Sequence, residues 1–211
     1  ANVDGIHIDP TDWNRSDGFS PNSSILTHVP GLDAPASDLP RWDDLEASLA
    51  ADATVVMVDT DGTRVALWAE PDVDPSSADD TLLVIHPAVA LTEGATYHVA
   101  IRGLVDGSGS PVEPSAAFRS YRDALTTDIA AIEDRRVEMD AMFADLATAG
   151  IDRNDLQLAW TFTVASTESI TGRMLHIRDA TLAELGDNAP RFTITDVVEP
   201  PELEREGLAR Q

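Results

Sequence analysis

The sequence has 211 residues, a net charge of −24 and a hydrophobic share of 43%. That share is too high for a chain that stays disordered, and the length predicts a single folded domain with an insertion. The 38 acidic residues face only 14 basic ones, all of them Arg, which disfavours phosphate backbones and anionic lipid as partners. We therefore expect no nucleic-acid binding. The same acidity is typical of salt-adapted proteins and of GC-rich genomes, and composition leaves both open.

The chain contains no cysteine, which excludes a disulfide framework, a thiolate zinc site and a cysteine nucleophile. No apolar run approaches the ~20 residues that cross a membrane as a helix, so we expect no membrane span. Catalysis by the chain would have to use hydroxyl, imidazole or carboxyl groups.

The predicted strands share β-branched or aromatic residues, period-two alternation and turn residues at their ends. They cover residues 25–29, 54–58, 63–69, 81–86, 96–101, 160–164 and 191–198. Asp61-Gly62 is a turn signal between the second and third strands and predicts a β-hairpin. Residues 1–24, rich in Asp, Pro, Ser and Asn, predict an irregular lead-in, and residues 199–211 predict a linker or tail.

Two helices are predicted from apolar residues spaced three and four apart. The first is an amphipathic insertion at about 122–150, ended by Gly150, and the second runs from about 168 to 185, ended by Gly186. Short strands separated by turn signals are typical of a β-sandwich, so we predict a mainly β fold over residues 25–198 with this α insertion. The predicted core is Val56, Leu67, Val84, Tyr97, Val99, Ile101, Trp160 and Phe162.

Several motifs resemble the bacterial immunoglobulin-like (Ig-like) domains of secreted and surface proteins. They are Leu83-Val84-Ile85-His86-Pro87, the approach Leu91-Thr92-Glu93-Gly94-Ala95-Thr96-Tyr97-His98-Val99, the turn Leu104-Val105-Asp106-Gly107-Ser108-Gly109-Ser110-Pro111-Val112, and the closing strand Trp160-Thr161-Phe162-Thr163. The resemblance implies an Ig-like antiparallel β-sandwich plus two helices, with the closing strand displaced by the inserted helix.

With Asp17-Gly18-Phe19-Ser20 and Gly150-Ile151-Asp152, the order of motifs over about residues 12–178 resembles the N-terminal region of large secreted bacterial lipases and esterase-like proteins. In those proteins an Ig-like module precedes an α/β-hydrolase domain. The resemblance implies a secreted, extracellular, non-catalytic accessory module that supports or docks a downstream hydrolase domain of the same chain. A glycan- or polymer-binding module and a self-sufficient hydrolase of another type remain the alternatives.

The sequence carries no Gly-x-Ser-x-Gly nucleophile elbow, and the nearest stretch, Gly107-Ser108-Gly109-Ser110, has the spacing of a turn. His86 and His98 lie on predicted strands where the two could approach each other across a sheet, although simple packing is the favoured interpretation. We therefore predict no catalytic and no cofactor-binding residues in this chain.

Two candidate binding features remain. Asp12, Asn14 and Asp17 have the alternating oxygen ligands of a calcium loop, but Gly18 comes one place late and the closing Glu is missing, so Asx turns are favoured over a calcium site. Trp42 stands among the polar neighbours Arg41, Asp43 and Asp44 and is the candidate for an exposed ring that stacks on a ligand such as a sugar.

Overall fold

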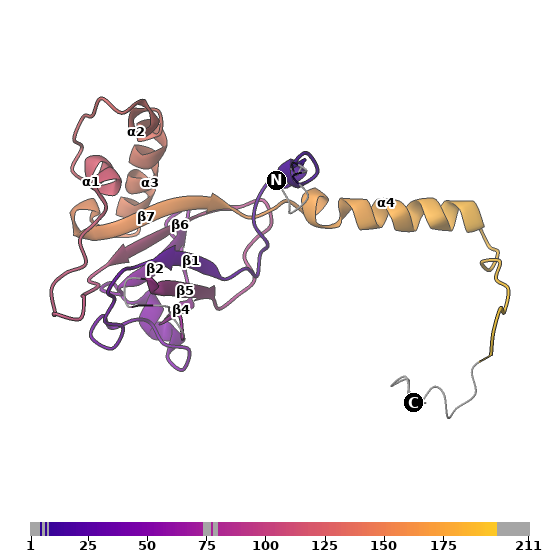
Figure 1. The fold of residues 1–211 in the computed structure, drawn as a ribbon, viewed down its shortest axis with the longest axis horizontal. Helices are drawn as coiled ribbons and strands as arrows, with labels where there is room; N and C mark the ends of the chain where they lie inside the picture. Colours follow the sequence, from indigo (N-terminus) through magenta and orange to yellow (C-terminus); the bar gives the residue numbers. More distant parts are fainter. Residues whose placement is uncertain (1–4, 6, 8, 74–76, 78–79, 198–211) are drawn as a thin grey trace. The chain divides into compact units, whose positions relative to one another are not determined.

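The computed structural model describes residues 5, 7, 9–73, 77 and 80–197. The chain divides into two compact units, Ala1–Thr171 and Gly172–Gln211. The first unit contains the strands and the helices α1 to α3, and the second contains most of helix α4 (Figure 1). Among the helices of the described residues, none combines the length and the apolar character that a membrane span requires.

The strands of the described residues form two antiparallel sheets, with the orders β1-β5-β4 and β3-β2-β6-β7. The strands are β1 (Ile25–His28), β2 (Val55–Asp59), β3 (Arg64–Val65), β4 (Leu67–Pro71), β5 (Leu82–Pro87), β6 (Thr96–Arg102) and β7 (Leu156–Thr163). The predicted β-rich fold with helical additions is thus confirmed.

The two sheets pack on a shared core, because alternate side chains of each strand point to the same face. This inter-sheet core includes Val55, Met57, Leu67, Leu83, Ile85, Tyr97, Val99 and Ile101. Trp160 and Phe162 of the edge strand are half-buried and pack against it. Two predicted core residues lie elsewhere: Val84 is half-buried at an alternate position of β5, and Val56 belongs to a second core under the helices.

The predicted hairpin forms, but its second strand is split. The turn is held by Asp59, whose Oδ1 accepts hydrogen bonds from the N–H groups of Asp61 (3.0 Å) and Thr63 (2.8 Å). After two residues paired with β2, the chain leaves this sheet at Ala66 and joins the other sheet as β4, where Leu67 lies opposite Pro87. The prediction of one strand over 63–69 is therefore wrong, because its two ends pair with different sheets.

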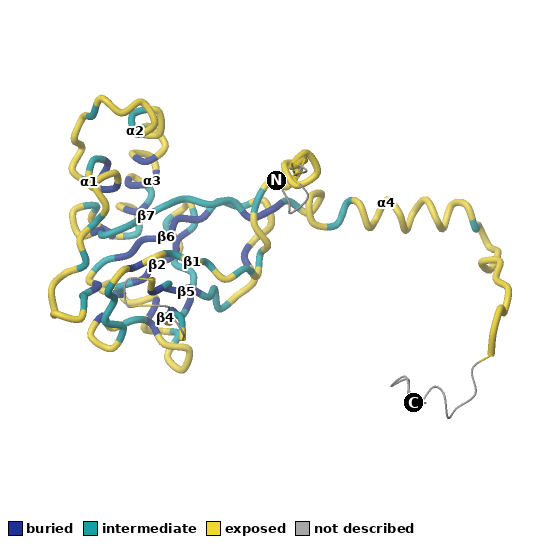
Figure 2. Tube along the Cα trace, viewed as in Figure 1, coloured by how far each residue is buried: buried dark blue, intermediate teal, exposed yellow. Residues whose placement is uncertain are grey.

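A helical layer covers the other face of sheet β3-β2-β6-β7 (Figure 1). Its helices are α1 (Ala116–Arg122), α2 (Ala130–Glu133) and α3 (Arg136–Thr148). The core beneath them combines strand residues with helix residues: Val56, Val58, Ala100, Leu156 and Ala159 with Phe118, Tyr121, Met139, Met142, Phe143 and Leu146. Figure 2 shows this burial along β2 and β6, in contrast with the exposed outer sides of the helices.

The prediction of one continuous helix over 122–150 is wrong. Leu125 and Ile129 fit the apolar period but are 51% and 53% exposed, and Ala124 adopts a positive φ of 52°, so the chain breaks after α1. The predicted stop is in place, since α3 ends at Thr148 and Gly150 has a φ of +77°. Short 3-10 helices occupy Trp13–Arg15, Leu45–Leu49 and Arg153–Asp155.

Helix α4 spans Thr167–Leu185 and has no buried residue. It ends before Gly186, as predicted. Residues 191–197 form no strand, although their sequence alternates as a strand does, because no neighbouring strand pairs with them. The prediction of a strand at 191–198 is therefore wrong over its described part, while Val198 and the predicted tail at 199–211 lie outside the described residues.

The helical layer contains an ion pair that makes stability depend on pH. Glu133 accepts hydrogen bonds from Arg136 (2.7 Å) and from the backbone N–H of Thr127 (2.8 Å), which together lower its pKa from 4.5 to about 2. Because this pKa is lower in the folded chain than in the unfolded one, ionised Glu133 stabilises the fold above about pH 4.5, and the contribution is lost as the pH falls towards 2.

We predict that Glu133→Gln is less stable than the unchanged chain at neutral pH, and that this difference shrinks as the pH falls from 4.5 to 2. Urea unfolding at a series of pH values measures it. Glu138→Gln, at an exposed position of α3, is the matched control. Its free energy of unfolding should differ from that of the unchanged chain by a constant offset at every pH. A constant offset for Glu133→Gln as well would contradict the assignment.

Candidate functional site

An open groove of about 540 Å³ lies between the loop at residues 34–42 and strand β4. Its walls include the indoles of Trp42 and Trp68 and the charged side chains of Asp38, Arg41 and Glu70. Trp42 is 70% exposed. A large aromatic ring left this accessible on a folded chain is a feature of recognition surfaces, since such rings supply most contact energy when a ligand covers them.

The loop that carries Trp42 is fixed by hydrogen bonds to other parts of the sandwich. The carbonyl of Pro40 accepts a bond from the N–H of Ala69 in β4 (2.9 Å), and the carbonyl of Asp38 accepts one from Thr54 Oγ1 (3.0 Å). Ser37, which is 1% exposed, accepts from the N–H of Val105 (3.0 Å). These contacts hold the groove in shape before a ligand arrives, which lowers the cost of binding.

Strand register fixes the orientation of Trp68. Trp68 lies directly opposite His86 on β5, and the two rings stack with their centres 4.7 Å apart and their planes 13° from parallel. His86 is held in turn, because its Nε2 lies 3.2 Å from Glu70 Oε1 and its Nδ1 lies 3.0 Å from Ser24 Oγ. Cross-strand pairs of this kind stabilise the sheet and here also orient one wall of the groove.

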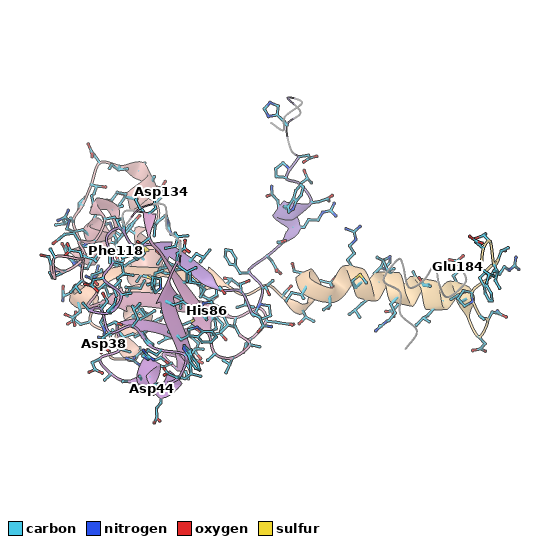
Figure 3. The ribbon with its side chains drawn as sticks, turned by 60° about the horizontal axis from the view of Figure 1, so that its bottom comes forward. Asp38, Asp44, His86, Phe118, Asp134 and Glu184 are labelled. Carbon is cyan, nitrogen blue, oxygen red and sulfur yellow. The ribbon has the colours of Figure 1, made fainter. Side chains whose placement is uncertain are left out.

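The charges around the groove are mostly acidic. Arg41 donates two bonds to Asp43, at 2.9 and 3.0 Å, and this pairing lowers the pKa of the Asp43 carboxyl. The guanidinium charge of Arg41 is therefore balanced within its own loop, while Asp38 and Glu70 add negative charge to the groove. Figure 3 places Asp38 and His86 in the sandwich part of the first unit, away from Asp134 in the helical layer.

The calcium-loop candidates have local roles in the structure. Asp12 forms an exposed ion pair with Arg15 (3.3 Å), and the backbone N–H of Asn14 donates to the carbonyl of Pro10 (2.9 Å). Asp17 Oδ1 accepts a bond from the N–H of Ser166 (3.0 Å), and hydrogen bonds from the side chain and then the backbone of Ser166 lower the pKa of the Asp17 carboxyl. Across the described residues no group of three or more His, Asp or Glu side chains is placed to hold a metal ion. Calcium binding by these residues stays a hypothesis.

A buried histidine network, which no motif of the sequence predicts, lies apart from the groove. His98 on β6 is 3% exposed, and its ring nitrogens lie 2.9 Å from Thr161 Oγ1 on β7 and 3.0 Å from Asp145 Oδ2 on α3. Its partners are 63 and 47 positions away in the chain, so no local pattern predicts them. The network ties α3 to the sheet beneath it.

The alternative in which His86 and His98 approach each other across a sheet is wrong, because β5 and β6 belong to different sheets. The stretch around Ser108 is a turn, as predicted: Asp106 Oδ1 accepts bonds from the N–H groups of Ser108 (2.9 Å) and Ser110 (3.0 Å). Neither the turn nor the buried network combines an exposed nucleophile with a positioned base.

A comparison of the chain with protein-family models gave no match, and a comparison with curated proteins gave none either. The geometry and charge of the groove are therefore the features that bear on function.

The structural role of His98 is testable. Thr161→Val keeps the shape and β-branching of the side chain but removes the hydroxyl beside a buried imidazole, so we predict a loss of about 1–3 kcal/mol in the free energy of unfolding. Thr163→Val is the matched control on the same strand, since its hydroxyl lies 3.3 Å from the half-buried Thr96 hydroxyl rather than beside a buried imidazole. Urea titration of both variants measures the difference, and equal losses would contradict the role of His98.

Proposed function

We propose that the chain is a non-catalytic, Ig-like module that binds a neutral polysaccharide in the groove between Trp42 and Trp68. The observation that carries this proposal is the exposure of Trp42, at 70%, in a groove whose second indole is oriented by His86. The sequence alone predicts Trp42 as the candidate for ligand stacking, and Trp68 adds a second ring from a strand.

The chemistry of the groove suits a sugar polymer. The C–H faces of pyranose rings pack on indoles, while sugar hydroxyls donate hydrogen bonds to carboxylates such as Asp38 and Glu70. The groove is open along its length rather than closed as a cavity, which suits a ligand that continues beyond the site. A polymer fits this shape better than a small cofactor does.

Charge selects among polymers. The net charge of −24 and the acidic groups at the groove repel uronic-acid and sulfated chains, and Arg41 is already paired with Asp43. A neutral hexose polymer meets no such repulsion. We therefore assign the ligand class as neutral polysaccharide.

The order of the strands supports the Ig-like assignment. Ig-type sandwiches pair strands as A-B-E-D in one sheet and as C-F-G, with C′ added beside C in some members, in the other. By chain order, β1-β5-β4 corresponds to B-E-D, and β3-β2-β6-β7 corresponds to C′-C-F-G. No strand of the described residues takes the place of strand A, and only Phe19 makes a short parallel bridge, to Val164 after β7.

An accessory role beside a secreted hydrolase domain follows from the sequence resemblance alone and stays a prediction. The groove is compatible with that role, because a module that binds a polymer raises the local concentration of an attached enzyme at its substrate. Binding by the chain does not depend on this role.

We predict that Trp42→Ala weakens binding to a soluble neutral glucan by about tenfold or more, the loss expected when a central aromatic contact worth about 1.4 kcal/mol is removed. Trp13→Ala is the matched control, because Trp13 is 69% exposed but lies outside the groove. Calorimetric titration with neutral and with uronic-acid polymers measures both effects. Equal losses in the two variants, or tighter binding of the anionic polymer, would overturn the proposal.

A further inference from the structure

A second recognition surface lies on the side of the sandwich where the two sheets end in β1 and β7. An apolar cleft of about 320 Å³ opens there, lined by Phe19, Ile25, Leu26, Trp160 and Phe162. Phe19 and Leu26 at its rim are 63% and 60% exposed. Exposed apolar clusters of this kind on a folded chain indicate an interaction surface.

Beside the cleft, β1 forms one edge of its sheet. The N–H of Val29 donates to the carbonyl of Thr81 (2.9 Å), and among the strands of the described residues β1 pairs with β5 alone. Because backbone groups alternate in direction along an antiparallel strand, the groups of Leu26 point away from β5 towards the open edge. Within the described part of the chain, no strand pairs with this edge. A sheet edge with outward-pointing backbone groups, as at Leu26, next to an apolar cleft is a template for an added strand.

The second unit contains a segment with the matching pattern. In residues 191–197, Phe192 and Ile194 alternate with Thr193 and Thr195, and the two apolar side chains are 84% and 70% exposed. This is the alternation of a half-buried strand, although the segment lacks a partner strand in the described chain. Helix α4, a rod of 19 residues and about 28 Å, ends at Leu185, and residues 186–190 join it to the segment, which belongs to the second compact unit.

We propose that residues 191–197 of a second copy of the chain add to β1 as a strand. Phe192 and Ile194 then enter the cleft against Trp160 and Phe162, and Thr193 and Thr195 face outward beside Leu26. Residues two apart in a strand are about 6.6 Å apart on one face, so both apolar side chains reach the same cleft. A reciprocal exchange between two copies pairs both open edges and closes the assembly as a symmetric dimer.

Analytical ultracentrifugation of the 211-residue chain tests the proposal, with twice the 22.6 kDa chain mass as the expected result. Phe192→Asp and Ile194→Asp should return the mass to that of one chain. Thr193→Asp and Thr195→Asp, on the opposite face of the added strand, are the matched controls and should keep the dimer. All four positions are exposed, so folding is unaffected. A monomer at every concentration, or equal disruption by the Thr variants, would overturn the proposal.

Cross-linking identifies the copy that supplies the strand, because the chain has no cysteine of its own. Copies carrying Leu26→Cys are mixed with differently tagged copies carrying Thr193→Cys or Thr195→Cys and then oxidised. A disulfide between the two tags is expected for at least one pair, above the level given by Val137→Cys at an 83% exposed site on α3. A cross-link that forms only within a chain carrying both cysteines would overturn the assignment to a second copy. Neither experiment involves the tryptophan groove, so the dimer proposal fails or succeeds independently of polysaccharide binding.

Discussion

The burial of β2 on both of its faces is the constraint on which the rest of the fold depends. Four consecutive residues, Val55 to Val58, are at most 1% exposed. Val55 and Met57 enter the core between the sheets, and Val56 and Val58 enter the core under the helices. A strand without a polar residue over this length has no face to offer to water, so the sheet around it needs a covering layer on each side.

The two layers that cover the sheet containing β2 differ in the side chains that they leave accessible. The helices on one side use their buried faces for the sheet, and the Thr161–His98–Asp145 network fixes α3 there. On the other side, sheet β1-β5-β4 buries only its inner face, and its alternate side chains, including Trp68, Glu70 and His86, remain for other contacts. The groove is therefore a consequence of the layering: a binding surface forms on the sheet that is buried from one side only.

Local patterns in the sequence predict most of the strands, because alternation and turn residues are local properties. They fail where the outcome depends on a distant partner. The break at Ala66 carries no Gly or Pro signal, since it arises from pairing with two different sheets. Leu125 and Ile129 follow a helical period but find no surface to cover. Residues 191–197 have the alternation of a strand, and that alternation becomes a strand only when a neighbour pairs with it.

In the candidate site, too, some features are predictable from the local sequence and others depend on distant partners. The exposure of Trp42 is predictable, because its neighbours Arg41, Asp43 and Asp44 keep that stretch of chain at the surface. The second ring, Trp68, is not predictable, because the two indoles line one groove only through the packing of the 34–42 loop on β4. The network from Ser24 through His86 to Glu70 likewise depends on strand register, which joins residues far apart in the sequence.

Amide hydrogen exchange, followed residue by residue in the free chain, tests the two-sided burial of the central sheet most directly. Amides of β2 and β6 should exchange most slowly, those of β1 and β4 faster, and those of α4 and residues 191–197 fastest in conditions where the chain is monomeric. Slower exchange in β4 and β5 than in β2 and β6, or exchange in α3 as fast as in α4, would contradict the account.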